Sequence, residues 1–144
     1  MLVQQILKSK PSTGTITVKP ETKISEVAAL LTEHRIGGVV VSSDGVSPDG
    51  ILSERDIVRA AARQGAGCFD EPAESIMTKD PKTCSGDETA DEILQRMTEG
   101  RFRHMPVVEG GKMIGIVTIG DLVAARLSEL SMEKSALEGM IMGH

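Results

Sequence analysis

Two copies of one short motif carry the residue types that could do chemistry in this chain. The first copy reads Gly-Ile-Leu-Ser-Glu-Arg-Asp from Gly50 to Asp56, and the second reads Gly-Ile-Val-Thr-Ile-Gly-Asp from Gly115 to Asp121. In each copy the apolar pair is typical of a strand, and the residues after the aspartate follow helical spacing. Each motif therefore predicts a strand that becomes a helix at its Ser or Thr.

The motif permits two interpretations. A hydroxyl residue three positions before a carboxylate is the pattern of a capping box, in which side chains satisfy the first N–H groups of a helix. The same helix start, with free N–H groups, could hold a phosphorylated sugar. A hydroxyl beside arginine suits a phosphate, and a short carboxylate suits the paired hydroxyls of a ribose. The preceding glycines, Gly50 and Gly115, would leave room for close approach to the backbone.

Basic side chains gather at positions that pseudo-symmetry could bring near these motifs. Arg55 lies inside the first motif, and Arg101, Arg103 and His104 form the most basic stretch of the chain. For Arg101 the alternative is a solvated turn between a helix and a strand. The first repeat has Gly38 where the second has His104. We therefore expect two non-equivalent sites, one more open and one more cationic.

The motifs belong to a longer internal duplication. Residues 18–41 match residues 84–107 at a constant offset of 66 positions, and Gly50 matches Gly115 at an offset of 65, because the second hairpin loop is one residue shorter. Each unit reads β-α-β-β-α, so the fold class is α+β (mixed α/β). One unit of about 60 residues would have a thin core. We expect the two units to pack sheet to sheet with pseudo-twofold symmetry.

The duplication divides the chain into three parts. We expect a first repeat with an N-terminal segment over residues 1–68, a second repeat over 69–127, and a helical tail over 128–144. In the tail, apolar residues recur at helical spacing at Leu127, Leu130, Leu137 and Ile141. This face could cover its own module or a second copy of the chain.

Composition argues against several classes of protein. The net charge of −5 and the near absence of aromatic residues disfavour nucleic-acid binding, which depends on Lys and Arg for phosphates and on aromatic rings for base stacking. Two distant cysteines predict neither a disulfide framework nor a zinc site. No apolar stretch approaches the roughly 20 residues that cross a bilayer, and no signal-peptide pattern opens the chain. We expect a cytoplasmic protein.

The sequence also lacks the common catalytic patterns. Its three histidines are not spaced as metal ligands, and it contains neither a nucleophile elbow nor a Walker loop. We therefore expect a non-catalytic protein that requires no cofactor and holds no metal.

The paired motifs resemble the CBS domain family, named from cystathionine β-synthase, and more narrowly the small stand-alone bacterial proteins with two such domains (Bateman modules). The resemblance rests on residues 50–59, 101–108 and 115–123 and extends from about Ile6 to Leu127. It implies a CBS domain pair with two clefts between the repeats, often assembled as a homodimer. The clefts of the family typically bind AMP, ADP or ATP, and sometimes NAD(H) or S-adenosylmethionine.

Matched position by position, the resemblance implies roles for ten residues. The expected ribose contacts are Asp56 and Asp121. The expected phosphate contacts are Ser53, Thr118, Arg55, Arg103 and His104. The residues expected to line the adenine pockets are Thr17, Gly38 and Thr83.

The function that follows is a regulatory module that senses an adenine nucleotide, AMP, ADP, ATP or NAD(H), in the clefts between its repeats. We expect a homodimer that acts on an unknown protein effector and has neither a nucleic-acid nor a membrane partner. The alternative is a ligand-free dimerisation scaffold whose Ser/Thr-x-x-Asp motifs serve only as helix caps. Enzymatic turnover of a nucleotide is a third hypothesis, with no catalytic motif behind it.

Overall fold

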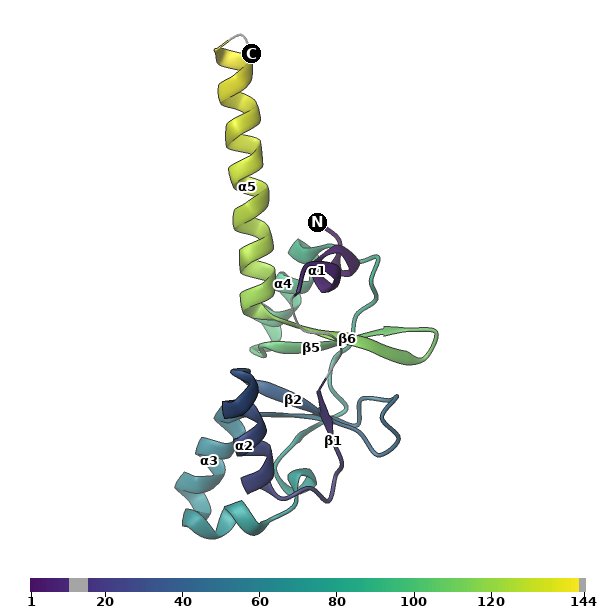
Figure 1. Ribbon diagram of the computed structural model, residues 1–144, viewed down its shortest axis with the longest axis vertical. Coiled ribbons are helices and arrows are strands. Elements are labelled where there is room, and N and C mark those ends of the chain that lie inside the picture. The colour runs from purple at the N-terminus through teal and green to yellow at the C-terminus, as the bar shows by residue number, and fades with distance from the viewer. Residues whose placement is uncertain (11–15, 143–144) are drawn as a thin grey trace.

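The computed structural model describes residues 1–10 and 16–142. Two sheets face each other, and helices cover the outer side of each sheet (Figure 1). The mixed α/β architecture with two repeats, predicted from the sequence, is confirmed. Among the described residues, no helix combines the length and the apolar character needed to cross a membrane.

The first sheet has four strands in the order β1-β2-β3-β4. β1 (Thr17–Val18) runs parallel to β2 (Gly38–Val41), which pairs antiparallel with β3 (Gly50–Ser53). β4 (Thr78–Lys79) arrives from later in the chain and pairs antiparallel with β3. The outer elements are α2 (Ile24–His34), α3 (Glu54–Gln64) and the 3₁₀ turns η1 (Gly65–Asp70) and η2 (Ala73–Ser75).

The second sheet is the antiparallel hairpin of β5 (His104–Glu109) and β6 (Lys112–Thr118). It packs with α1 (Val3–Ser9), α4 (Ala90–Gly100) and the start of α5 (Ile119–Ile141). The sequence predicts a strand at Thr83-Cys84, but the structure has only a single parallel bridge there, between Cys84 and Val107. The pairing does not extend as it does in the first repeat, where the amide of Val40 donates to Ile16, because the matched residue in the second repeat is Pro106, which has no N–H.

Each repeat is completed by the segment that precedes the other repeat. α1 stands before the first repeat in the chain, yet Val3 and Ile6 are buried in the core of the second, with Met105 and Leu122. Conversely, Ala73 of η2 is buried in the core of the first repeat. This exchange joins the two halves into one body. The domain boundaries at 68/69 and 127/128 stay predictions.

The glycines that open the two motifs are required by this exchange. A Cβ on Gly50 would lie 2.5 Å from the sulfur of Met77 and 2.9 Å from the carbonyl oxygen of Thr78, and one on Gly115 would lie 2.8 Å from Leu7. The sequence interpretation left this space for a ligand. That interpretation is wrong, because the chain's own crossing segments fill the space.

The final helix runs unbroken from Ile119 to Ile141, so the expected helical tail is a continuation of α5 as far as Ile141. Residues 143–144 of that tail lie outside the described residues. Its first turns pack on the second repeat, where Leu122 and Ala125 are buried and Arg126 pairs with Asp91 of α4 (3.5 Å). The remainder projects away from the body (Figure 1). This projecting part carries its apolar side chains into solvent.

Candidate functional site

Both motifs form real capping boxes at the starts of α3 and α5. The amide of Ser53 donates to Asp56 Oδ2 (2.9 Å), and the amide of Thr118 donates to Asp121 Oδ2 (2.9 Å). The aspartate amides donate back to the two hydroxyl oxygens. Each cap uses only one carboxylate oxygen, and Oδ1 of each aspartate has no hydrogen-bond partner among the described residues. A cap and a ligand contact are therefore compatible at the same side chain.

The two helix starts offer fewer free amides than the sequence predicts. The first amide of α3 donates to the carbonyl of Gly37, and the first amide of α5 donates to the carbonyl of Arg103, each at 2.9 Å. The third amide of each helix belongs to the cap. Only the second amides, those of Arg55 and Gly120, lack an acceptor in the described part of the chain. Recognition of an anion here would thus depend mainly on side chains.

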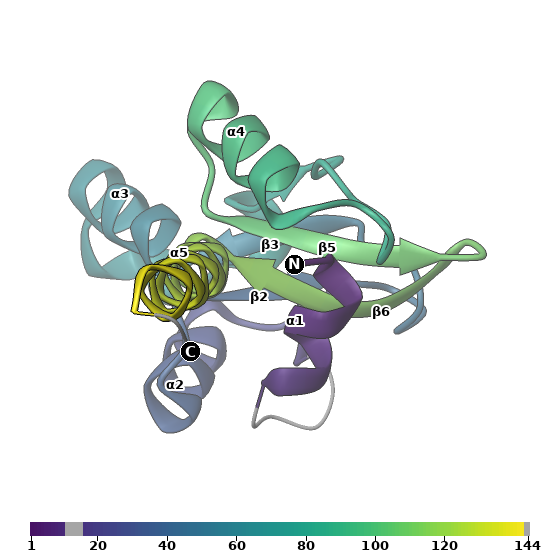
Figure 2. The same ribbon diagram turned by 90° about the horizontal axis from the view of Figure 1, so that it is seen from above.

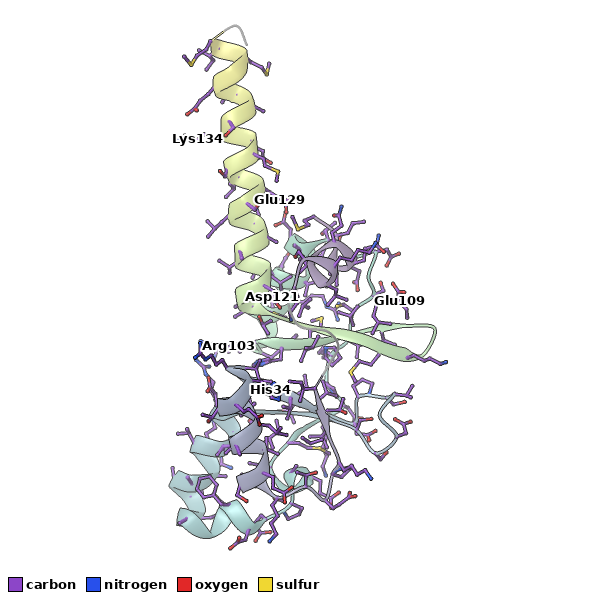
Figure 3. The ribbon with its side chains drawn as sticks, viewed as in Figure 1. His34, Arg103, Glu109, Asp121, Glu129 and Lys134 are labelled. Carbon is purple, nitrogen blue, oxygen red and sulfur yellow. The ribbon has the colours of Figure 1, made fainter. Side chains whose placement is uncertain are left out.

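Both helix starts border one cavity of about 910 Å³ between the repeats. Sites for small molecules typically measure roughly 300–1,000 Å³. Figure 2 shows α2, α3 and α5 gathered at one side of the sheets, and Figure 3 shows Asp121 and Arg103 there, where the two halves meet. Eight of the ten predicted site residues line the cavity: Gly38, Ser53, Arg55, Asp56, Arg103, His104, Thr118 and Asp121.

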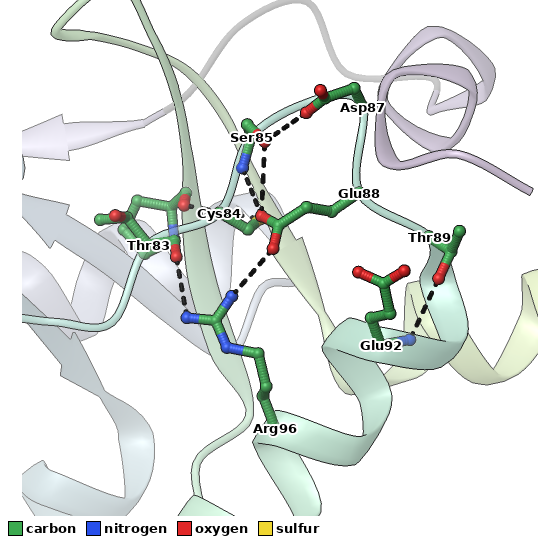
Figure 4. Close-up of polar contacts among 9 residues, drawn as sticks. Thr83, Cys84, Ser85, Asp87, Glu88, Thr89, Glu92 and Arg96 are labelled. Atoms are coloured by element: carbon green, nitrogen blue, oxygen red, sulfur yellow. Dashed lines mark hydrogen bonds and ion pairs between the residues drawn. The ribbon is translucent and has the colours of Figure 1, made fainter.

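The other two predicted site residues, Thr17 and Thr83, do not line this cavity. Thr17 borders a separate open depression beside α2. Thr83 is exposed, and its carbonyl is held by Arg96 (3.0 Å), which also pairs with Glu88 (3.4 Å; Figure 4). The apolar side chains of the cavity come instead from Ile16, Ile36, Ile51, Phe102, Ile116 and Ile119. A role for the two threonines at adenine stays a prediction.

The cavity is cationic although the chain is acidic. Eight Lys and Arg residues and four Asp and Glu residues line it, a formal charge of +4 in a chain of net charge −5. The basic residues are Lys10, Arg35, Arg55, Arg59, Lys79, Lys82, Arg101 and Arg103. A cleft of one sign concentrates ligands of the opposite sign. The arrangement therefore favours a polyanionic ligand.

Sequence reasoning missed five of these cations: Lys10, Arg35, Arg59, Lys79 and Lys82. A signal for one of them was present, because Arg35 stands at the position matched to Arg101 by the repeat offset. Both arginines end a helix with a left-handed backbone, at φ 53° for Arg35 and 56° for Arg101. The solvated turn considered for Arg101 is thus also part of the cavity wall.

His104 links the two repeats inside the cavity. A Cβ on Gly38 would lie 3.0 Å from His104 Nε2, so the glycine of the first repeat and the histidine of the second face each other directly. The expected contrast between an open and a cationic site thus falls within one continuous cavity. Burial lowers the pKa of His104 below its usual value, against the raising effect of the Asp56 and Glu54 charges. Near pH 7 the ring is therefore neutral and can accept a hydrogen bond as well as donate one.

Comparison with protein families gives a match to the CBS domain over residues 3–63 and 73–128. A 17.7 kDa protein of Acidianus ambivalens is 38% identical over 123 residues, which cover 85% of this chain and 73% of that protein. A CBS domain-containing protein of Arabidopsis thaliana is 31% identical over 132 residues, which cover 87% of this chain. Those residues make up 24% of the plant protein, so the chain spans about a quarter of that relative.

Solved structures resemble the whole body of this protein. A CBS-domain-containing protein from Agrobacterium tumefaciens has a TM-score of 0.82 and 43% identity, covering 88% of this chain and 99% of that one. A CBS domain protein from Pyrobaculum aerophilum complexed with AMP has a TM-score of 0.77 and 28% identity, covering 92% and 99%. A CBS domain pair in complex with 5′-methylthioadenosine and S-adenosyl-L-methionine has a TM-score of 0.77 and 27% identity, covering 90% and 98%. The chain belongs to the CBS domain family and contains two CBS domains in tandem.

Proposed function

We propose that this protein is a non-catalytic regulatory module that binds a phosphorylated adenine nucleotide in the cavity between its repeats. The observation that carries the proposal is the formal +4 charge of the cavity in a chain of −5. A helix-capping role alone would require no such concentration of cations. A nucleotide would supply the matching negative charge through its phosphates.

The ligands of related structures suggest an adenosine derivative, and the charge of this cavity favours some adenosine derivatives over others. One related structure contains AMP, and another contains 5′-methylthioadenosine and S-adenosyl-L-methionine. These ligands share adenosine but differ in charge, because S-adenosylmethionine carries a sulfonium cation. A surplus of Lys and Arg favours the phosphorylated members. We therefore infer ATP, ADP or AMP ahead of S-adenosylmethionine.

The polar groups that remain available suit such a ligand. Oδ1 of Asp56 and of Asp121 would accept hydrogen bonds from ribose hydroxyls. The hydroxyl of Thr118 accepts from the amide of Asp121 (3.1 Å), and its own hydrogen can still be donated to a phosphate. The hydroxyl of Ser53 instead lies 3.0 Å from Asp56 Oδ2 and donates to it. The second motif therefore offers a free hydroxyl donor to a phosphate, whereas the hydroxyl of the first motif already donates to its own aspartate.

The strained arginines support the same ligand class. A left-handed backbone costs a residue with a Cβ about 1–2 kcal/mol, and glycine is the usual residue at this position after a helix. Arg35 and Arg101 both occupy it, and both line the cavity. Strain repeated at paired positions of a cavity is explained if the guanidinium groups contact the ligand.

Titration of ATP, AMP, NAD, NADH and S-adenosylmethionine by calorimetry tests the proposed ligand class. We expect ATP to bind more tightly than S-adenosylmethionine, and Asp121→Ala or Asp56→Ala to weaken ATP binding at least tenfold, because a ribose acceptor is lost. Each substitution also removes the carboxylate half of a capping box, while the N-cap hydroxyl stays, so the loss of stability should not exceed about 1 kcal/mol. Thr89→Ala is the matched control, since Thr89 caps α4 outside the cavity. If none of these ligands binds to protein that is free of co-purified nucleotide, the proposal is contradicted and the ligand-free dimerisation scaffold is favoured.

Replacing the strained arginines by glycine separates stability from binding. We expect Arg35→Gly and Arg101→Gly each to raise the free energy of unfolding by about 1 kcal/mol, because the left-handed strain is relieved. The same variants should bind ATP more weakly. Arg63→Gly, in the last turn of α3, is the control and should lower stability by about 1 kcal/mol. Chemical denaturation measures the stability of all three variants, and calorimetry measures their affinity for ATP. A loss of stability in both Arg35→Gly and Arg101→Gly would show that the left-handed arginines are not strained.

We also propose that the protein forms a homodimer through the projecting part of α5. Val123, Leu127, Leu130, Leu137 and Ile141 are between 42% and 77% exposed. With Lys134 they follow the alternating four- and three-residue spacing of a coiled-coil seam, and a single lysine in such a seam is a known device for fixing register. The seam fits a second copy of the same helix. An effector protein that responds to this dimer stays a prediction.

Light scattering after size exclusion tests the dimer. We expect a particle of twice the 15.3 kDa chain mass for the native protein. Leu130→Glu with Leu137→Glu should give the mass of one chain, because two charges would be buried in the seam. Met132→Glu is the control, since Met132 is 63% exposed and lies off the seam. A dimer that survives the double substitution would place the interface elsewhere.

A further inference from the structure

We propose that Lys10 makes one half of the cavity selective for ligands that carry phosphate. This half, here called the Asp121 half, is the part bordered by Thr118 and Asp121. The Asp56 half is the part bordered by Ser53 and Asp56. The inference rests on the proposed nucleotide-binding function of the cavity.

Lys10 is held in place at the start of α5. Its Nζ lies 2.9 Å from Asp121 Oδ2 and donates to the carbonyl of Ile116, also at 2.9 Å. The side chains of Lys10 and Asp121 are only 22% and 23% exposed. An ammonium group has three N–H donors, and these contacts use two. Because Lys10 lines the cavity, the third donor is available to a ligand there.

The ion pair leaves the ribose contact intact. Lys10 and the amide of Thr118 share Asp121 Oδ2, while Oδ1 has no hydrogen-bond partner among the described residues. Lys10 therefore neutralises the carboxylate without occupying the oxygen that a ribose hydroxyl would need. The Asp121 half combines a hydroxyl acceptor with a fixed cation.

The Asp56 half differs at the position that matches Lys10. The crossing segment that reaches the first repeat reads Ile76-Met77-Thr78-Lys79-Asp80, and its Met77 lies against Gly50 as Leu7 lies against Gly115, which aligns residues 76–80 with residues 6–10. Asp80 therefore stands where the other segment has Lys10, and each is followed by proline in the sequence. No ion pair reaches Asp56 from any part of the chain that the structure describes. The two halves therefore differ at the carboxylate itself.

This difference predicts different ligand requirements. In the Asp121 half, the neutralised carboxylate does not repel a phosphate, and the ammonium adds a charge-assisted hydrogen bond to it. Without Lys10, a partly buried carboxylate would face the phosphates unpaired. Lys10 should therefore raise the affinity for ligands that carry phosphate and leave the affinity for adenosine nearly unchanged. In the Asp56 half, a phosphate would face a carboxylate that has no ion-pair partner among the described residues, so this half gains no comparable preference for phosphate.

The test compares ATP with adenosine as calorimetric probes on the full chain. The titrations use protein carrying Asp56→Asn, so that the Asp121 half dominates the signal, and repeat them with Lys10→Met added. We expect Lys10→Met to weaken ATP binding roughly tenfold or more and to leave adenosine binding within about twofold. Lys10→Arg should retain the preference for ATP. Lys8→Met, at an exposed position of α1 two residues before Lys10, is the matched control and should change the affinity for neither ligand.

The outcomes separate this inference from the proposed function. If neither the native chain nor Asp56→Asn binds ATP or adenosine, the proposed function itself fails. If both ligands bind and Lys10→Met changes their affinities by the same factor, Lys10 only positions Asp121 and the inference is overturned. A gain in affinity for ATP would also overturn it, because Lys10 would then block the site. Thermal unfolding monitors each variant, and Lys10→Gln replaces Lys10→Met if the latter does not fold.

Discussion

The exchange of leading segments between the repeats is the constraint on which the rest of the structure depends. A single unit of about 60 residues would be only marginally stable alone, and each core here is closed by a segment from beside the other repeat. Val3 and Ile6 complete the second core, and Ala73 completes the first. The same crossing brings Lys10 to Asp121 and the segment around Asp80 into the cavity wall. The same segments therefore close the two cores and supply part of the cavity wall.

The helix cap and the candidate ligand contact need not compete. In both motifs Oδ2 of the aspartate fixes the first turn of the helix, and Oδ1 has no hydrogen-bond partner among the described residues. The cap holds the carboxylate in one orientation, which reduces the ordering needed when a ligand binds. The question is therefore not whether the motif caps a helix but why so many cations surround it. A polyanionic ligand would explain why the cavity lining carries a formal charge of +4 in a chain of net charge −5.

The sequence predicted the features that depend on interactions between residues close together in the chain. The duplication gave the repeat architecture, the strand-to-helix turns and the positions of Asp56 and Asp121, because spacing and capping chemistry act over a few residues. Lys10 was missed because its partner lies more than a hundred positions away and is chosen by how α1 packs on the second repeat. The role given to Gly50 and Gly115 was wrong for the same reason, since the crossing segments cannot be placed from the sequence. Thr17 and Thr83, at matched positions of the two repeats, both lie outside the lining of this cavity, whether the strand is formed, as at Thr17, or reduced to a single bridge, as beside Thr83.

A crystal structure of the protein grown with saturating ATP would test the central claim most directly. We expect one nucleotide or more inside the cavity between the repeats, with ribose hydroxyls at the carboxylate of Asp121 or Asp56. The phosphates should lie among the basic side chains, within hydrogen-bond distance of Thr118 or Lys10 when the Asp121 half is filled. A nucleotide bound outside this cavity, or a cavity that stays empty under these conditions, would contradict the account.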